Sequence, residues 1–432
     1  MTPNPHASVV PSLRVIPRDE HDISRKQMSR SALKVLYHLR EAGFSAYLVG
    51  GAVRDLLVGR APKDFDIATD ATPEQVKSIF RNCRLIGRRF RLAHVVFGRE
   101  IIEVATFRAN GGNDDEEEGR EVLASGRLVR DNVYGSIEDD ALRRDFTVNA
   151  LYYSIADFSV HDYVGGFADV QSRTLRLIGE PEARYREDPV RMLRAARLAA
   201  KLEFSIDPAT AAPIPKLAPL LADAAPARLF EEAMKLFLAG HAKSSFEHLE
   251  AFGLLPELLP ETAQALALNK SGALRRMLVQ GLINADTRVA AGEPASPAFL
   301  FAVLLWPAYC RALAQLQAQG IQAVDAQRRA ADRVTMRQVA RTALPRRFSL
   351  PMQEIWLLQP RFVLRQNKRV SRLLAHPRFR SAFDFLELRL AASDTHAADV
   401  GFWREAQSRP GRVLDEDNRV AGNRPDSSGD QQ

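Results

Sequence analysis

The order of apolar and polar positions predicts two kinds of structure along the chain. Up to about residue 180, short apolar runs alternate with polar turns, whereas residues 180–392 are rich in Ala, Leu and Arg and have the character of successive helices. Several prolines between 208 and 226 mark breaks between those helices, because proline ends or kinks a helix. The pattern therefore predicts an α+β first part followed by an all-α part.

The first part is expected to hold one early helix and a small sheet. Leu33, Leu36 and Tyr37 fall at the i, i+3, i+4 spacing of one helix face, which predicts a helix over residues 29–42. Short apolar or β-branched runs predict strands, and these runs lie at 46–49, 85–87, 92–98, 101–107, 151–155 and 174–178. We expect a small mixed or antiparallel sheet with helices on one side.

Composition shifts along the chain predict five segments. Residues 1–25 are polar with scattered prolines, which is typical of a disordered lead-in. The end of the chain is polar and lacks aromatic residues from 411 onward, which favours disorder there as well. The predicted segments are a lead-in over 1–25, an α+β part over 26–180, a helical part that spans 181–255 and 256–395, and a mostly disordered tail over 396–432.

Composition adds only a weak bias toward a polyanionic partner. The chain has 432 residues, of which 46% are hydrophobic and 26% are charged, as in ordinary globular proteins. The formal net charge of +7 suits a polyanion without proving one. Cys83 and Cys310 are too few for a disulfide framework or a Cys-based zinc site. We see no signal-peptide pattern and no apolar stretch of about 18 residues, so we expect a cytoplasmic protein with no membrane partner.

The strongest candidate chemistry lies within residues 47–70. Asp64 and Asp66 are two residues apart, so in an extended strand both carboxylates point to the same face. Two adjacent carboxylates repel each other, and Mg²⁺ relieves the repulsion because it binds one or two carboxylates and leaves other positions to phosphate oxygens. Such a pair is common in loops, but here Gly50 and Gly51 precede it, and glycines let backbone N–H groups approach a phosphate. The segment therefore predicts a metal–nucleotide site.

Nucleotidyl transfer with two metal ions roughly 3.5–4 Å apart usually needs a third acidic group. Glu103 lies on a predicted strand of the same sheet and Asp145 lies in an Arg-Arg-Asp run; we lean to Asp145 and keep Glu103. Arg54 has two equal interpretations, a phosphate contact or a structural bridge to a carboxylate. Arg143 and Arg144 suit bidentate contact with a triphosphate or ribose, and the alternative is a solvated pair.

A second carboxylate–arginine pair opens the helical part. Asp188 is a natural N-cap, and Pro189 after it suits the first helical position. Arg191 is three residues from Asp188 and so shares its helix face. The two side chains together offer the acceptors and donors that read the edge of a base. The alternative is a capped helix with an internal ion pair, which the sequence alone favours.

Arginines recur in patterns that suit phosphate contact. In the first part they flank an aromatic residue, which suits phosphates and a stacked base, with a solvated hairpin as the equal alternative. In the helical part four fall on one predicted helix face, where like charges disfavour a helix unless a polyanion binds; a solvated surface is the alternative. The arginines concerned are Arg88, Arg89 and Arg91 in the first part, and Arg329, Arg333, Arg337, Arg341, Arg346 and Arg347 in the helical part.

Four motifs in order resemble those of the class II nucleotidyltransferases, the bacterial poly(A) polymerases and tRNA CCA-adding enzymes. They are LVGGAVRD at 48–55, KDFD at 63–66, RRDFTVNA at 143–150 and EDPVR at 187–191. The segment LIGRRFRLAHV at 85–95 is similar to the one that marks the poly(A) polymerases within that group. One departure is the end of the chain, where 414–432 has more acidic than basic residues, although family members often end in a strongly basic tail.

The resemblance implies a palm-like nucleotidyltransferase head over 26–180, a helical neck with a base-recognition motif over 181–255 and a helical RNA-binding body over 256–395. It also implies roles for the candidate residues. Asp64 and Asp66 would hold the metal ions with Asp145 or Glu103 assisting; Gly50, Gly51 and Arg54 would hold the triphosphate; and Asp188 with Arg191 would select the incoming base.

The expected function is template-independent addition of AMP from ATP to RNA 3′ ends, with two Mg²⁺ ions and pyrophosphate release. Its expected partners are RNA 3′ ends, ATP and RNA-decay proteins, since tailing would promote RNA decay, and no DNA is expected. One alternative is a tRNA CCA-adding enzyme. Another, of a different class, is a non-catalytic RNA-binding protein, which the presence of the acidic residues disfavours.

Overall fold

In a computed structural model of the chain, an eight-stranded mixed sheet forms the centre of the first part. The structure describes residues 12–87, 91–109, 120–122, 128–131, 133–390 and 393–408. The chain divides into two units, which we call the head unit (Met1–Glu187 with Glu203–Pro213) and the helical unit (Asp188–Leu202 with Ile214–Gln432). The predicted end of the head at residue 180 therefore falls before α6 (Pro181–Glu187), which belongs to the head unit.

The strands of the sheet run in the order β1-β10-β9-β2-β3-β6-β5-β4, and every neighbouring pair is antiparallel except β3 and β6, which are parallel. The predicted mixed sheet is thus confirmed, and the turn at Gly98 and Arg99 joins β5 to β6 as expected. The strands are β1 (Arg14–Ile16), β2 (Ala46–Val49), β3 (Asp66–Thr69), β4 (Cys83–Ile86), β5 (Leu92–Phe97), β6 (Glu100–Thr106), β9 (Leu151–Ser154) and β10 (Val160–Asp162).

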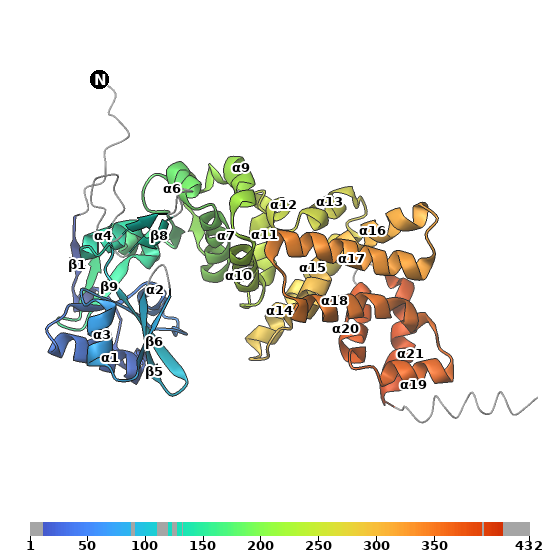
Figure 1. The fold of residues 1–432 in the computed structure, drawn as a ribbon, viewed down its shortest axis with the longest axis horizontal. Coiled ribbons are helices and arrows are strands. Elements are labelled where there is room, and N and C mark those ends of the chain that lie inside the picture. Colours follow the sequence, from blue (N-terminus) through green and yellow to red (C-terminus); the bar gives the residue numbers. More distant parts are fainter. Residues whose placement is uncertain are drawn as a thin grey trace, which may run out of the picture. The chain divides into compact units, whose positions relative to one another are not determined.

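Helices lie on both faces of this sheet. On one face α1 (Arg30–Glu41) and α3 (Pro73–Ile79) contact the central and edge strands (Figure 1). On the other face α4 (Ile137–Arg143) contributes Ala141 to an apolar cluster with Val49 and Ala68. The expectation of helices on one side only was wrong, because α4 covers the β2–β3 end of the second face. The β4–β6 end of that face carries exposed side chains.

Two predicted disordered segments contain ordered elements. β1 lies within the predicted lead-in and pairs with β10, where Ile16 is completely buried. α21 (Ala397–Ser408) lies within the predicted tail and buries Trp403 completely. The prediction of a disordered lead-in was wrong at β1, whereas α21 is an ordered part of a tail that was predicted to be mostly disordered. In both places a few apolar residues are enough to dock a short element on an existing core, although the segment as a whole is polar. Residues 1–11 and 409–432 lie outside the described residues.

Smaller elements complete the head unit. β7 (Arg120–Val122) pairs with β8 (Leu128–Asp131), and β11 (Thr174–Leu175) pairs in parallel with β12 (Ser205–Ile206). The strand predicted at 174–178 is therefore only two residues long. The remaining helices are α2 (Gly51–Leu57), α5 (Gly166–Gln171), α6 and α8 (Pro208–Ala211).

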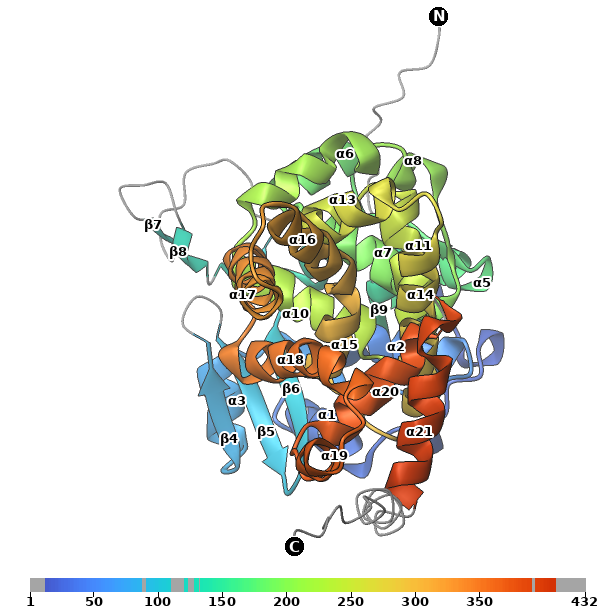
Figure 2. The same ribbon diagram turned by 90° about the vertical axis from the view of Figure 1, so that its right-hand side faces the viewer.

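The helical unit consists of helices throughout the part that the structure describes (Figure 2), as the composition predicted. Trp356 donates its indole N–H to the Ala302 carbonyl oxygen at 3.0 Å, and Trp403 donates to that of Phe362 at 2.7 Å. The helices are α7 (Val190–Leu202), α9 (Ile214–Leu217), α10 (Pro226–Phe237), α11 (Ala242–Ala251), α12 (Leu255–Leu258), α13 (Pro260–Leu268), α14 (Ala273–Ala290), α15 (Pro297–Leu304), α16 (Trp306–Ala318), α17 (Ala323–Thr342), α18 (Arg346–Leu358), α19 (Asn367–Leu374), α20 (Phe379–Arg389) and α21.

None of the described helices is by itself long and apolar enough to cross a membrane. The pair α15 and α16, bent by 53° at its junction, meets the length and composition limits only when taken together.

Candidate active site in the head unit

The glycines and the carboxylates meet because β2 and β3 are antiparallel neighbours. β2 ends at Val49, which is the register partner of Asp66, the first residue of β3. Gly50 and Gly51 follow directly and begin α2. Gly50 has φ +69° and ψ −134°, a conformation that a residue with a Cβ atom rarely adopts. A sharp turn that only glycine accepts therefore places the start of α2 beside the start of β3.

Glu103 is brought to the same place by the parallel pairing of β3 with β6. Asp66 and Glu103 are register partners, and partners on neighbouring strands project to the same face. Burial and then the Glu103 charge raise the pKa of Asp66 from 3.8 to about 6, with a smaller contribution from Asp64. Asp66 keeps part of its surface in contact with water although surrounding protein desolvates its carboxylate. Asp64 lies two residues before β3 and is also exposed, while Phe65 between them is buried. The alternation expected for an extended pair is confirmed.

These residues suit a hard cation in kind. They offer only carboxylate oxygens, which are the ligands that Mg²⁺ prefers. Burial first and the Glu103 charge second raise the pKa of Asp66, and a bound cation would oppose both effects because it favours the charged carboxylate. Across the described ranges, no three His, Cys, Asp or Glu side chains are gathered closely enough to hold a metal ion. The metal role of Asp64 and Asp66 stays a prediction.

Asp145, the favoured third carboxylate, lies in a different arrangement. Its Oδ1 accepts the N–H of Phe146 at 2.8 Å and the side-chain N–H of Asn149 at 3.2 Å. Asn149 in turn accepts an N–H from Arg54. Asp145 thus caps the short turn after the Arg-Arg-Asp run, and of the two candidates the geometry favours Glu103.

Arg54 is a structural bridge in this conformation. Its guanidinium is 3% exposed and donates from Nε and Nη2 to Asp55 Oδ1, at 2.9 and 2.7 Å, and from Nη1 to Asn149. Every nitrogen of the group is used, which ties α2 to the 144–150 segment. Of the two equal interpretations, the geometry favours the structural one.

Arg144 lies against the glycine turn. A Cβ atom on Gly50 would lie 3.4 Å from Arg144 Nη1, so the glycine leaves room for this guanidinium. Arg144 donates to Asp140 Oδ2 at 2.9 and 3.1 Å and to the Tyr152 hydroxyl at 3.0 Å. Burial alone would lower the pKa of Arg144, but Tyr152 and Asp140 outweigh it and raise that pKa. The charge of Arg144 also opposes the rise in the pKa of Asp66, which makes it the cation of this site.

The pair expected to read the base lies in the helical unit. Asp188 Oδ1 accepts the N–H of Val190 at 3.2 Å, so the predicted cap at the start of α7 is confirmed. Its other oxygen, Oδ2, accepts an N–H of Arg228 on α10 at 2.8 Å. Arg191 lies on the first turn of α7. The base-reading role of Asp188 and Arg191 stays a prediction.

The arginines predicted to contact RNA fall into three groups. Arg88 and Arg89 lie outside the described residues, and Arg91 pairs with Glu74 at 2.6 Å. On α17, Arg337 pairs with Glu261 and Arg341 contacts Glu257. Carboxylates of α12 and α13 thus explain two arginines of the predicted stripe without a polyanion.

The remaining arginines of the set stay available. Arg333 is half-buried on α17, and Arg346 and Arg347 are exposed at the start of α18. Arg347 lies over the ring of Phe348 with its guanidinium carbon 4.8 Å from the centroid. Arg346 and Arg347 line an open hollow of about 440 Å³ together with Arg378.

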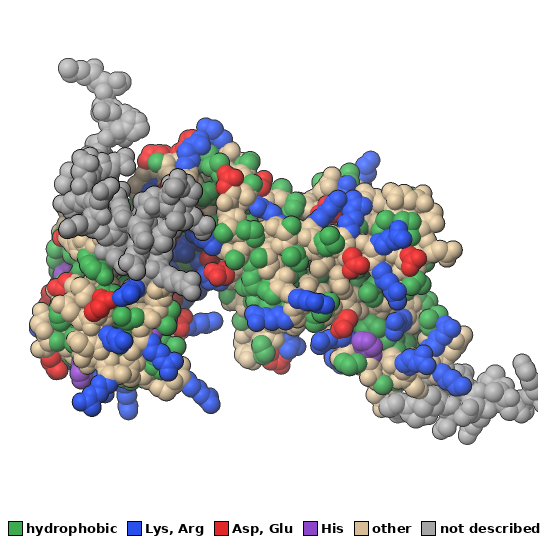
Figure 3. Space-filling model, viewed as in Figure 1, with side chains coloured by type: hydrophobic (Ala, Val, Ile, Leu, Met, Phe, Trp, Pro, Cys, Tyr) green, Lys and Arg blue, Asp and Glu red, His purple; other side chains and the backbone are tan. Residues whose placement is uncertain are grey.

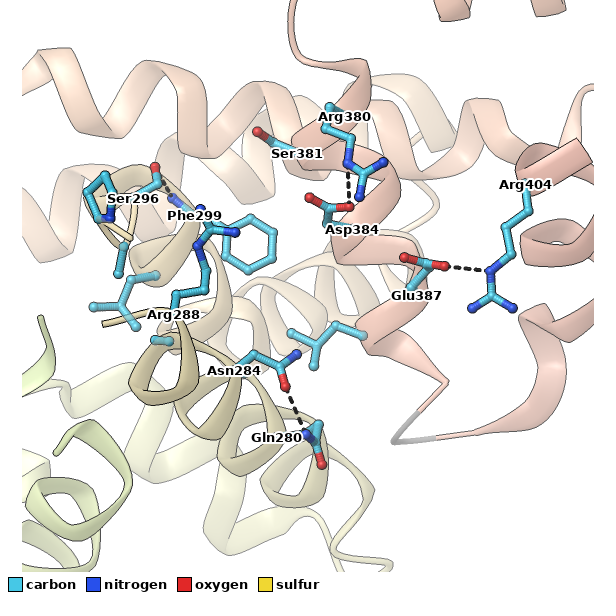
Figure 4. A pocket seen from close by; sticks show the side chains of 16 residues that line it. Gln280, Asn284, Arg288, Ser296, Phe299, Arg380, Ser381, Asp384, Glu387 and Arg404 are labelled. Atoms are coloured by element: carbon cyan, nitrogen blue, oxygen red, sulfur yellow. Dashed lines mark hydrogen bonds and ion pairs between the residues drawn. The ribbon is translucent and has the colours of Figure 1, made fainter. Parts of the chain in front are cut away.

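A larger hollow of about 670 Å³ lies between α14, α15, α20 and α21 (Figure 4). Its charged groups are ion-paired: Arg288 with Glu293, Arg380 with Asp384 and Arg404 with Glu387. Sequence patterns pointed to none of these residues.

Two contacts at the candidate sites were not anticipated. His94 Nε2 lies 3.5 Å from Glu103 Oε2, and Arg228 holds Asp188. Strand alternation gives the face of β5 on which His94 lies relative to its neighbours in the strand. The sequence alone does not give the register between β5 and β6, which makes His94 a neighbour of Glu103. Arg228 is 40 residues from Asp188, and no local signal links them.

Family models match three parts of the chain. Residues 46–176 match the "Poly A polymerase head domain", residues 203–266 match the "Probable RNA and SrmB- binding site of polymerase A" and residues 319–429 match the "Polymerase A arginine-rich C-terminus". The first of these spans the glycine turn, both aspartates, Glu103 and Arg144.

Curated relatives match over almost the whole chain. The "Poly(A) polymerase I" of Salmonella typhi is 52% identical over 402 residues, which is 92% of this chain and 86% of the relative. That of Haemophilus influenzae is 44% identical over 391 residues, 90% and 86% of the two chains. A "CC-adding tRNA nucleotidyltransferase" of Halalkalibacterium halodurans is 35% identical over 260 residues, 60% of this chain and 61% of the relative.

Solved structures share the fold. The CCA-adding enzyme of Bacillus stearothermophilus in complex with CTP is 28% identical, with a TM-score of 0.57 over 89% of this chain and 84% of that one. The CCA-adding enzyme of Thermotoga maritima complexed with tRNA has a TM-score of 0.58 at 18% identity, over 89% and 83%. The predicted palm-like head followed by a helical part is confirmed.

Proposed function

The chain belongs to the poly(A) polymerase family, and we propose that its reaction takes place where β2, β3 and β6 bring Gly50, Asp66 and Glu103 together. The protein is a polynucleotide adenylyltransferase that adds AMP to RNA 3′ ends without a template. The observation that carries the placement is the strand register, which sets Asp66 between Val49, just before the glycine turn, and Glu103.

In the proposed reaction the oxygen of the RNA 3′-hydroxyl bonds to the α-phosphorus of ATP. The bond from that phosphorus to the bridging oxygen breaks, pyrophosphate leaves and the hydroxyl proton passes to water. Arg144 faces the glycine turn and would neutralise the triphosphate there. The first backbone N–H groups of a helix such as α2 have no hydrogen-bond partner within the helix. Because Gly50 and Gly51 have no side chain, phosphate oxygens could reach these N–H groups.

Asp64, Asp66 and Glu103 would hold two Mg²⁺ ions. When bound, such ions activate the attacking hydroxyl and neutralise the charge on the leaving group. The support for this assignment is the pairing of Asp66 with Glu103 on neighbouring strands and the all-oxygen set of donors. Asp145 is not needed as a ligand, because its hydrogen bonds to Phe146 and Asn149 give it a structural task.

Selection of adenine is proposed to depend on Asp188 and Arg191. Arg228 holds one carboxylate oxygen of Asp188, and the N–H of Val190 holds the other. A carboxylate fixed at both oxygens presents its remaining lone pairs in one direction, which favours one pattern of base donors over another. We expect Arg228→Ala to raise KM for ATP several-fold with little change in kcat, since it loosens a binding contact.

The alternative of a CCA-adding enzyme has weaker support. Relatives with that activity match a shorter part of the chain at lower identity than the poly(A) polymerases do. The alternative of a non-catalytic RNA-binding protein has no feature in its favour, because Asp64, Asp66 and Glu103 are all retained.

RNA is the proposed polymer substrate, contacted in the helical unit by Arg333, Arg346 and Arg347. Arg337 and Arg341 are weaker candidates because carboxylates already pair with them. A cytoplasmic location and a part in RNA decay through partner proteins complete the proposal. The location is the expectation from the sequence given above, and the part in RNA decay rests on the family alone.

The nucleotide-choice assay tests the activity. The protein is incubated with Mg²⁺ and either a generic RNA or a tRNA trimmed of its terminal CCA, with ATP or CTP in separate reactions. We expect long AMP addition to the generic RNA and little CMP addition to either. Substantial CMP addition to the trimmed tRNA would overturn the assignment.

The Asp66→Ala variant tests the site. We expect it to keep the far-ultraviolet circular dichroism of the wild type and to lose tailing. The matched control is Asp22→Ala, which removes an exposed carboxylate from the same unit. Wild-type tailing by Asp66→Ala would refute the placement.

A further inference from the structure

A row of four side chains crosses the sheet from the carboxylates to its edge. Asp66 on β3 pairs with Glu103 on β6, Glu103 pairs with His94 on β5, and His94 pairs with Arg84 on β4. β6, β5 and β4 lie side by side (Figure 2), and register partners project to the same face. The row therefore begins with two acids and ends with an exposed arginine.

We infer that this row is the track of the RNA primer. The 3′-terminal nucleotide lies over Glu103 and His94, and Arg84 binds a phosphate upstream of it. The inference rests on the proposed function and adds the path of the second substrate through the head unit.

The sheet surface differs on the two sides of Asp66, toward β2 and toward β6. On the β2 side, Val49 and Ala68 are buried under α4, and the glycine turn with Arg144 provides the proposed triphosphate contacts. On the β6 side, no described helix of the head unit packs on the same face, and its side chains from Glu103 to Arg84 are partly or fully exposed. In phosphoryl transfer the attacking and leaving oxygens lie roughly in line on opposite sides of the phosphorus. With pyrophosphate leaving on the β2 side, the 3′-hydroxyl must approach from the β6 side.

The face that carries the row combines exposed apolar side chains with charged ones. Ile101 on β6 is 51% exposed and Ile86 on β4 is 47% exposed, and both lie on the same face as the row by strand alternation. A solvent-facing sheet surface with two large apolar residues beside a charged row suits a ligand that has both apolar rings and charged groups. A nucleic acid strand has that composition, with bases and riboses beside phosphates.

The charge of Arg84 and its distance from Asp66 also suit an RNA phosphate. Arg84 is exposed, and the described residues include no ion-pair partner for it. Neighbouring strands are about 4.8 Å apart, so the backbone at Arg84 lies about 14 Å from that at Asp66. A primer whose last hydroxyl is at the carboxylates therefore reaches Arg84 with an upstream phosphate. The side chains drawn in Figure 3 include exposed Lys and Arg on the part of the molecule that the view shows.

The test compares Arg84→Glu with Arg40→Glu. Arg40 is exposed on α1, which packs on the opposite face of the sheet, so the control makes the same charge change away from the row. For Arg84→Glu we expect KM for RNA to rise about tenfold, with KM for ATP and the melting temperature unchanged. The salt dependence of log KM for RNA should lose about one unit of slope, as for one lost phosphate contact. Arg40→Glu should match the wild type.

Photo-crosslinking gives a readout that does not need turnover. An RNA with 4-thiouridine next to its 3′ end is irradiated with the wild-type protein without ATP, and crosslinked peptides are mapped. We expect crosslinks to β4, β5 or β6.

The outcomes separate the two proposals. A wild-type protein that does not extend RNA with ATP would contradict the proposed function. A wild-type protein that does extend RNA, together with an unchanged KM for RNA in Arg84→Glu or crosslinks that avoid these three strands, would overturn the primer track alone.

Discussion

Replacing Asp66 with asparagine should abolish tailing and at the same time stabilise the metal-free protein. The pKa of Asp66 is raised from 3.8 to about 6, first by burial and then by the Glu103 charge. A rise of that size corresponds to about 3 kcal/mol at 1.36 kcal/mol per pKa unit. Because part of the Asp66 side chain faces water, screening reduces the value, and we expect about 1–2 kcal/mol.

The sign follows from proton binding. Between about pH 4 and pH 6 the folded state holds a proton on Asp66 that the unfolded state has released. The free energy of unfolding therefore falls as pH rises through that window, and the full penalty is present above pH 6. The side-chain amide of the Asp66→Asn variant carries no charge, so this variant should escape the penalty.

The assay is thermal and urea unfolding in EDTA at about pH 4 and pH 7.5. At pH 7.5 the Asp66→Asn variant should be more stable than the wild type by about 1–2 kcal/mol, and its melting temperature should be roughly 2–8 °C higher for a unit of this size. At pH 4 the two should nearly coincide. Mg²⁺ should stabilise the wild type at pH 7.5, because a ligand that binds only the folded state raises stability, and should affect the variant less. Asp22→Asn is the control for loss of an exposed carboxylate. Equal stability of Asp66→Asn and wild type at pH 7.5 would refute the reasoning.

Three further substitutions test packing. Arg54→Ala should destabilise the head unit by about 3–5 kcal/mol, because it removes a buried guanidinium that bonds to Asp55 and Asn149; a loss of unfolding free energy below about 1 kcal/mol would contradict the bridge. Gly166→Ala should cost about 3 kcal/mol, since a Cβ atom would lie 2.1 Å from the Thr147 carbonyl oxygen, and an unchanged melting temperature would contradict it. Trp403→Ala should destabilise the helical unit by about 3–5 kcal/mol, measured as earlier protease cleavage near α21; wild-type resistance would show that α21 contributes little.

Local patterns predicted much of the fold because they depend on neighbours in the chain. The helix at 29–42 and the strand at 46–49 follow from side-chain period, and both appear within one residue as α1 and β2. β1 was missed because three residues carry too little periodic signal. Its stability comes from pairing with β10, about 145 positions away in the register, which no local window contains.

In the candidate site, too, the sequence predicts what depends on neighbours in the chain and misses what depends on distant pairing. Asp64 and Asp66 could be found because their spacing of two residues has a direct meaning in a strand. The choice between Glu103 and Asp145 could not be made, because it depends on whether β6 pairs with β3 in parallel and in which register. A shift of the register by one residue would turn Glu103 to the face on which α1 and α3 pack. The partner of Asp188 was missed for the same reason, since Arg228 lies on another helix.

The segment 144–150 shows how a motif can be recognised correctly while its residues have other tasks than expected. Asn149 accepts from Arg54 with its side-chain oxygen, donates to Asp145 with its side-chain nitrogen and accepts from Arg144 with its carbonyl oxygen. One residue thus ties α2, the turn at Asp145 and the guanidinium beside Gly50. Of these residues, only Arg144 lies where it also acts on the charge of Asp66. The residues of this motif therefore hold the Arg144 guanidinium in place beside the site. The other members of the motif are required because a buried network with one unpaired member costs more than the same network left complete.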